Sequence, residues 1–188
     1  MNCRFLVGRL LVDCAVFCSL VGLAVVTRLL MIQPNFHAVT AAALLAGFYF
    51  RGRAVAALVP LVAMTASDWF IGGYAKEVMI TVYLAMVLPI AFRSLLRARL
   101  TPVRVAGSAV VASLAFFLVT NAAVWHAGIW YPRGWDGLVR CYTLGLPFLA
   151  NALAGDLLFS AALFGAYALV TRFAVNLSPE YCTAQAEA

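Results

Sequence analysis

Long apolar runs alternate with short polar breaks along this chain, and each break contains proline, glycine or arginine. A membrane-spanning helix uses about 20 apolar residues, whereas Pro, Gly and charged residues tend to end or interrupt it. Six apolar runs fit this description or come close to it. They cover residues 10–32, 36–50, 54–71, 78–92, 105–127 and 148–170. The pattern predicts an all-α polytopic membrane protein, a bundle of about six transmembrane helices.

The breaks predict finer features of this bundle. Pro89 lacks a backbone donor and should kink the fourth span near its end. We expect a polar linker over residues 93–104 and a short interfacial helix over residues 138–146, before Pro147 introduces the last span. The predicted domain organisation is a single six-helix transmembrane domain over residues 1–175 and a polar C-terminal tail over residues 176–188.

The composition supports the membrane prediction and excludes a soluble enzyme. Of 188 residues, 65% are hydrophobic and 11% are charged, whereas a soluble domain is about 45–50% apolar and about 25% charged. With so little chain left for water-exposed loops, any function must lie within the helices or at their ends. Ser-His-Asp, HExxH and paired-carboxylate patterns do not occur, so we expect no enzymatic activity.

The formal net charge of +6 is explained by the distribution of the basic residues. If the N-terminus is cytoplasmic, nine basic residues fall on the cytoplasmic side and three on the outer side. Membrane proteins carry such an excess of Lys and Arg in their cytoplasmic loops. The nine are Arg4, Arg9, Arg51, Arg53, Arg93, Arg97, Arg99, Arg104 and Arg172, and the three are Lys76, Arg133 and Arg140. We therefore predict a multi-pass protein of the bacterial cytoplasmic (inner) membrane. Its basic residues should contact the lipid bilayer and no nucleic acid.

The cysteines and histidines suggest no metal site. The five cysteines are Cys3, Cys14, Cys18, Cys141 and Cys182. They form neither a CxxC pair nor a Cys/His ligand spacing, and their odd number argues against a disulfide framework. His37 and His126 are the only histidines, and no further ligand pattern supports a haem site between them. We expect no metal and no cofactor.

Polar residues within the spans gather in the outer half of the predicted bundle, and Asp13 is the exception in the inner half. Ionisable residues within spans cost roughly 2.5–3.5 kcal/mol on insertion scales, so they usually face a cavity or a partner. The outer set is Arg28, Gln33, Asn35, His37, Asp68, Asn121, His126, Asn151 and Asp156. The distribution predicts a wet or ligand-filled cavity in the outer half.

Asp156 lies deeper than the other acidic residues of this outer set, about 12 Å into the last span at 1.5 Å per residue. A carboxylate at that depth would take up a proton or find a cation, and Arg28 is the candidate. We hold open a structural Asp156–Arg28 ion pair and a ligand contact by Asp156. Asp68 could instead pair with Arg140 or Lys76.

Aromatic residues crowd the same outer end. They are Trp69, Tyr74, Trp125, Trp130, Tyr131, Trp135 and Tyr142. Tryptophan and tyrosine form interfacial belts in most membrane proteins, and the same side chains could also form a lid over a binding cavity; the sequence leaves both readings open. The candidate ligand-binding residues are Asn35, His37, Asp68, Trp69, Asn121, Trp125, Tyr142, Asn151 and Asp156.

Several short segments resemble a bacterial six-helix membrane family defined as a domain of unknown function. The resemblance covers roughly residues 30–170. It rests on residues 35–41, Gly47 to Phe50, Ser67-Asp68, Thr120 to Trp125, Cys141-Tyr142, Leu146 to Phe148, Asn151 and Gly155-Asp156. At the level of fold, six helices, a cytoplasmic N-terminus and an outer polar cavity are similar to the substrate-binding S components of energy-coupling factor transporters. That resemblance implies partners, namely a transmembrane coupling subunit and ATPases.

These observations lead to a functional hypothesis and an alternative. The first is a small-molecule binding and uptake subunit that holds its solute in the outer half of the bundle. The alternative is a non-catalytic membrane assembly or interaction protein whose outer aromatic residues contact a partner. Co-purification distinguishes the two, because an ATPase partner favours uptake and an envelope complex favours assembly.

Overall fold

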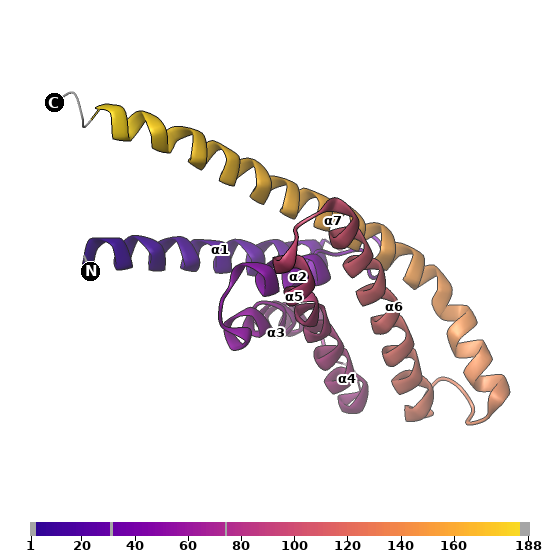
Figure 1. Ribbon diagram of the computed structural model, residues 1–188. Helices are drawn as coiled ribbons and strands as arrows, with labels where there is room; N and C mark the ends of the chain where they lie inside the picture. Colours follow the sequence, from indigo (N-terminus) through magenta and orange to yellow (C-terminus); the bar gives the residue numbers. More distant parts are fainter. Residues whose placement is uncertain (1–2, 31, 74, 185–188) are drawn as a thin grey trace.

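The computed structural model describes residues 3–30, 32–73 and 75–184, and it describes side chains from residue 7 to residue 173 except at 31 and 74. Within these residues the regular structure is entirely helical (Figure 1). In chain order the elements are α1 (Cys3–Leu29), α2 (Val39–Tyr49), α3 (Arg53–Ile71), α4 (Lys76–Val87), the 3₁₀ helix η1 (Leu88–Phe92), α5 (Arg93–Ala98), α6 (Pro102–Ala127) and α7 (Trp135–Ala184). The predicted all-α bundle is confirmed.

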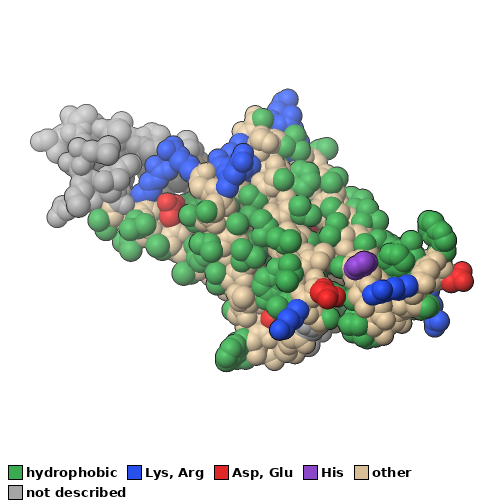
Figure 2. Space-filling view, turned by 90° about the horizontal axis from the view of Figure 1, so that it is seen from below, with side chains coloured by type: hydrophobic (Ala, Val, Ile, Leu, Met, Phe, Trp, Pro, Cys, Tyr) green, Lys and Arg blue, Asp and Glu red, His purple; other side chains and the backbone are tan. Residues whose placement is uncertain are grey.

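Five helical segments are long and apolar enough to cross a membrane. They are Val7–Leu29, Arg53–Ile71, Lys76–Ala98, Pro102–Ala127 and Trp135–Phe173. Their outward faces carry large apolar side chains, such as Leu10 with 63% and Val103 with 82% of its surface exposed. Figure 2 shows charged side chains gathered at two opposite ends, with a mostly hydrophobic surface between them. This is the surface that a lipid-embedded bundle requires.

The short helix α2 lies at the centre of the bundle. Its residues from Val39 to Gly47 are buried, and α2 packs against every other helical element. A helix that is apolar on all sides is stable only when it is surrounded by other helices. Small residues allow the close approach: a Cβ on Gly47 would lie 3.1 Å from the Cα of Ile90 in η1. The second predicted segment is therefore a core helix. Its 11 residues span about 16 Å, too short for a hydrocarbon core of about 30 Å.

Local sequence signals account for several helix ends. Thr101 accepts a hydrogen bond from the backbone N–H of Arg104 at 3.3 Å, and Pro102 occupies the first turn of α6. Gly128 ends α6 with a φ of 66°, the left-handed conformation that glycine adopts without strain. The kink expected at Pro89 is present as η1, where the α-helix tightens into a 3₁₀ helix.

Two predicted boundaries are wrong. The expected linker over 93–104 is helical from Arg93 to Ala98. The expected interfacial helix over 138–146 is not separate, because α7 continues through Pro147 as one helix of 50 residues. At 1.5 Å per residue α7 is about 75 Å long, and Figure 1 shows it curving along the bundle. Of the predicted tail over residues 176–188, the part up to Ala184 belongs to α7 and the rest lies outside the described residues.

Two arginines hold the end of α2 in place. Arg93 donates to the carbonyl of Arg51 at 2.8 Å, and Arg97 donates to the carbonyls of Phe48 and Phe50 at 2.7 and 2.6 Å. These bonds satisfy carbonyl groups at the C-terminus of α2, where a cation is also favoured by the helix dipole. Both chain ends lie on one side of the molecule (Figure 1). Which end of the bundle faces the cytoplasm stays a prediction.

Candidate ligand-binding cavity

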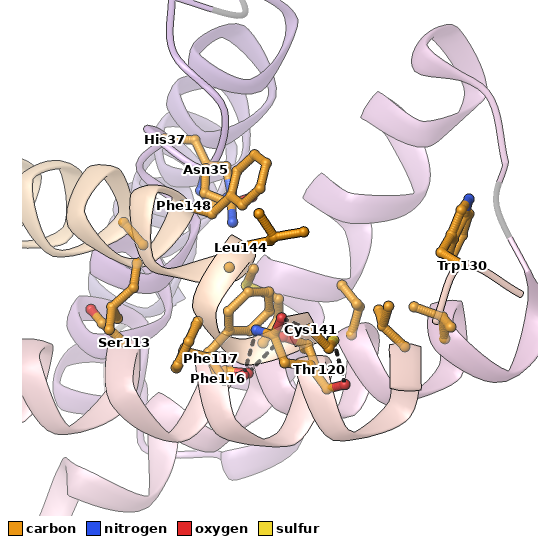
Figure 3. Close-up of a pocket in the computed structure, with 18 of the residues that line it drawn as sticks. Asn35, His37, Ser113, Phe116, Phe117, Thr120, Trp130, Cys141, Leu144 and Phe148 are labelled. Carbon is orange, nitrogen blue, oxygen red and sulfur yellow. Dashed lines mark hydrogen bonds between the residues drawn. The ribbon is translucent and has the colours of Figure 1, made fainter. Parts of the chain in front are cut away.

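A cavity of about 530 Å³ lies at the end of the bundle where α2 begins. We call it the upper cavity. Its wall is built by the end of α1, the turn before α2, and parts of α3, α4, α6 and α7. Figure 3 shows Asn35 and His37 on one side, Phe116, Phe117 and Thr120 along α6, and Trp130 at the far end. The lining is mostly apolar with a few polar groups, which is the usual character of a small-molecule site.

Asn35 and His37 enter the upper cavity from a tight turn that α7 holds in place. Asn35 has a φ of 63°, a conformation that Asn tolerates better than most residues. Asn151 donates to the carbonyl of Pro34 at 3.1 Å. A Cβ on Gly155 would lie 3.3 Å from the backbone nitrogen of His37, so glycine permits the close packing of this turn on α7. Asn151 is thus a positioning residue for the turn and does not line the cavity.

The His37 ring presents an unused polar atom. Its Nδ1 is buried and has no hydrogen-bond partner among the described residues. Burial, with a smaller contribution from the nearby Arg28 charge, lowers the pKa of His37 to about 4. The ring is therefore neutral at pH 7, and its free nitrogen can donate or accept one hydrogen bond with a ligand, depending on the tautomer. The other histidine, His126, is exposed and does not line the cavity.

The ion pair of the cavity joins Arg28 to Asp68, at 2.8 Å between Nη2 and Oδ1. Arg28 also donates to Ser67 Oγ at 2.6 Å and contacts Met64 Sδ at 3.0 Å, while Tyr83 donates to Asp68 at 2.9 Å. The proposed pairing of Arg28 with Asp156 is wrong. In the part of the chain that the structure describes, α1 packs against α2 and α3 and not against α7. The predicted alternatives for Asp68, Arg140 and Lys76, are not its partners either.

Asp156 instead lies buried between α6 and α7, with 3% of its surface exposed. Ser113, whose side chain lines the upper cavity, is 2.6 Å from Asp156 Oδ2 and 2.9 Å from the Ala109 carbonyl. A serine hydroxyl has one hydrogen and cannot donate to both. The Ser113 hydroxyl therefore donates either to Asp156 Oδ2 or to the Ala109 carbonyl. Asp156 thus supports the cavity wall from behind.

The α6–α7 wall is held by close packing around Asn121. Asn121 donates to the Phe117 carbonyl at 2.8 Å, and the buried Cys141 thiol contacts the Asn121 backbone oxygen at 3.4 Å. A Cβ on Gly145 would lie 2.7 Å from Asn121 Oδ1, so a larger residue would displace that side chain. Tyr142 donates to the Leu118 carbonyl at 2.7 Å and does not line the cavity. Asn121 is therefore the residue of this wall that the sequence and the structure both place in the site.

Only part of the predicted aromatic set covers the cavity. Trp130 and Tyr131 line it, whereas Trp69 and Trp135 have 87% and 81% of their surfaces exposed. The indole nitrogen of Trp125 is buried without a partner among the described residues, but Trp125 does not line the cavity. Tyr74 lies outside the described residues. The interfacial belt and the lid over the cavity both stay predictions.

Of the nine predicted ligand-binding residues, three line the upper cavity: Asn35, His37 and Asn121. Sequence reasoning missed other lining side chains, among them Met64, Met86, Ser113, Phe116, Phe117 and Thr120. Their type gave little signal, because Met, Phe and Ser are ordinary packing residues in membrane helices. Thr120 was recognisable from its position next to Asn121 on the same helix.

Neither a curated protein nor a solved structure matches this chain, so the similarity to transporter S components stays a prediction. The match to a family covers nearly all of the helices described above. With residues 9–179 matching its family model, the chain belongs to the family of unknown function DUF6580.

Proposed function

We propose that the protein is a multi-pass protein of the bacterial cytoplasmic membrane that binds a small organic solute in the upper cavity and serves its uptake. The observation that carries this proposal is the cavity itself. Its volume of about 530 Å³ falls within the range of about 300–1,000 Å³ that is typical of small-molecule sites. Its few polar groups converge from α1, α6 and the turn before α2.

The charges around the upper cavity favour an uncharged solute. Among the residues that the structure describes, Arg28 is the only charged side chain that lines it, and Asp68 already balances that charge. His37 is neutral at pH 7. An ionic solute would therefore lose its hydration without gaining an unpaired counter-charge.

The aromatic lining favours a planar solute. Five aromatic side chains line the cavity, and aromatic rings stack on one another in offset or edge-to-face arrangements. They are Phe116, Phe117, Phe148, Trp130 and Tyr131. His37 and Asn121 would fix the orientation of the solute by hydrogen bonds. The chain has no nucleotide-binding motif, so energy-driven uptake would need partner ATPases, as the resemblance to S components implies.

A steric variant tests the site. Ala152 lines the upper cavity, whereas Ala154, two residues further along α7, is exposed. We expect Ala152→Leu to weaken solute binding about tenfold or more, because a misfitting methylene group in a pocket is worth about 1–3 kcal/mol. Ala154→Leu should leave binding unchanged. The measurement is the ligand-induced shift of thermal unfolding in mild detergent, with riboflavin and nicotinamide as neutral planar probes and pantothenate as a charged, acyclic one.

The outcomes separate binding from folding. We expect a planar probe to raise the unfolding temperature of the native chain and to leave that of Ala152→Leu unchanged. Without a probe, Ala152→Leu should unfold at the same temperature as the native chain. Equal shifts in both variants would place the solute outside the upper cavity. A shift with pantothenate alone would contradict the neutral, planar class.

A further inference from the structure

A second cavity, of about 460 Å³, lies at the opposite end of the bundle and is basic. We call it the basic cavity. Arg9 of α1, Arg51 after α2 and Arg97 of α5 line it, together with Asp13, Tyr49 and Tyr167. Three guanidinium groups therefore face one carboxylate. That carboxylate already accepts a hydrogen bond from the Tyr49 hydroxyl at 2.8 Å.

Two of the three arginines have no side-chain partner among the residues that the structure describes. Arg97 is fixed by its bonds to the Phe48 and Phe50 carbonyls. Neither Arg9 nor Arg51 makes a side-chain hydrogen bond or an ion pair with any residue that the structure describes. Arginine guanidinium groups recognise phosphate by paired, charge-assisted hydrogen bonds. The basic cavity thus combines free phosphate-binding donors with an excess of positive charge.

Aromatic side chains also line the basic cavity. The Phe48 and Tyr167 rings meet edge to face at 5.2 Å between centroids, and the Tyr49 and Tyr167 rings do so at 6.5 Å. These rings come from α2 and α7, so the cavity is built by elements distant in the sequence. An anion bound by the arginines would therefore lie next to aromatic rings that pack against one another.

The surroundings indicate that the anion belongs to a lipid. In the same part of α1 as Arg9, the side chains of Val7, Leu10 and Leu11 have 51%, 63% and 65% of their surfaces exposed. Apolar surface of this kind at a membrane helix accommodates acyl chains, while basic residues at its end meet headgroups. We propose that the basic cavity binds the phosphate headgroup of an anionic membrane lipid, with the acyl chains along α1. This inference does not depend on the solute proposed for the upper cavity.

Charge-neutral variants test the site on the full-length protein in a neutral detergent. We expect the double variant Arg9→Gln/Arg51→Gln to bind phosphatidic acid at least about tenfold more weakly than the native chain, because two charge-assisted donors are lost. The control is Arg99→Gln with Arg172→Gln, which removes the same charge from exposed arginines that do not line this cavity. Lipid retention is read by native mass spectrometry, with diacylglycerol of the same chains as the phosphate-free probe.

Three results would overturn the proposal. Equal weakening in the double variant and the control would show general electrostatic attraction instead of a site. Equal retention of diacylglycerol and phosphatidic acid would show that the phosphate is not recognised. Displacement of phosphatidic acid by an equimolar amount of glycerol 3-phosphate would identify a soluble phosphate compound as the ligand and not a lipid. Weakening confined to the double variant and to phosphatidic acid supports the lipid site.

Discussion

Arg28→Leu is expected to lower the free energy of unfolding by about 3–5 kcal/mol, the usual cost of removing one partner from a buried ion pair. Arg28 and Asp68 have side chains only 13% and 8% exposed. Without Arg28, the Asp68 carboxylate would keep the hydrogen bond from Tyr83 but lose its counter-charge. The α1–α3 contact should therefore loosen. Denaturant titration in mild detergent measures the change.

Two further variants make this expectation specific. Arg28→Leu combined with Asp68→Leu should be more stable than Arg28→Leu alone, because a buried pair replaced by apolar residues leaves no isolated charge. Arg140→Leu removes an exposed arginine of α7 and should change stability by less than about 0.5 kcal/mol. A loss in Arg28→Leu no larger than that in Arg140→Leu would contradict the ion pair.

Gly137→Ala is expected to destabilise the protein by about 3 kcal/mol, at the upper end of the usual cost of overpacking. A Cβ at this third residue of α7 would collide with the carbonyl oxygen of Pro132. The backbone would have to move, since that oxygen belongs to the main chain. The loop from Gly128 to Gly134 also carries Trp130 and Tyr131 into the upper cavity, so solute binding should weaken as well.

Gly107→Ala is the matched control, because Gly107 also lies in the first turns of a helix and a Cβ there meets no atom within 4 Å. This variant should be neutral or slightly stabilising, since alanine favours helix over glycine. Thermal unfolding of both variants in one detergent gives the comparison. An unchanged unfolding temperature in Gly137→Ala would show that the turn at Pro132 is not as close as described.

The positions of the membrane-spanning helices were predictable where the length and composition of an apolar run are sufficient to identify a helix. The apolar runs that became α1, α3, α4 and α6 contain few charged residues and are bounded by breaks, so the sequence places them directly. Pro89 was predictable because its missing donor acts on its own helix. Pro147 was misread, because a proline within a long, well-packed membrane helix does not have to end it.

The sequence that we interpreted as a second membrane span also fits a buried core helix, which is what α2 is. Residues 36–50 are apolar, but a run that short is more typical of a core helix than of a span. Its many small residues, which let neighbouring helices approach, pointed the same way.

The partner of Arg28 could not be predicted, because the choice between Asp68 and Asp156 depends on which helices are neighbours. Depth along a span is readable from the sequence, but helix adjacency is not. In the same way, the gathering of Asn35, His37 and Asn121 followed from their common depth. Trp69 shares that depth and still faces outward, because rotation about the α3 axis decides its direction. The site was therefore predictable as a layer of the bundle but not as a set of contacts.

The most direct test of a solute-binding role is native mass spectrometry of the full-length protein released gently from its own membrane. We expect a bound neutral small molecule on the native chain and on Ala154→Leu, and its loss from Ala152→Leu. The same adduct retained by Ala152→Leu, or no small molecule on any of the three chains, would contradict solute binding in the upper cavity.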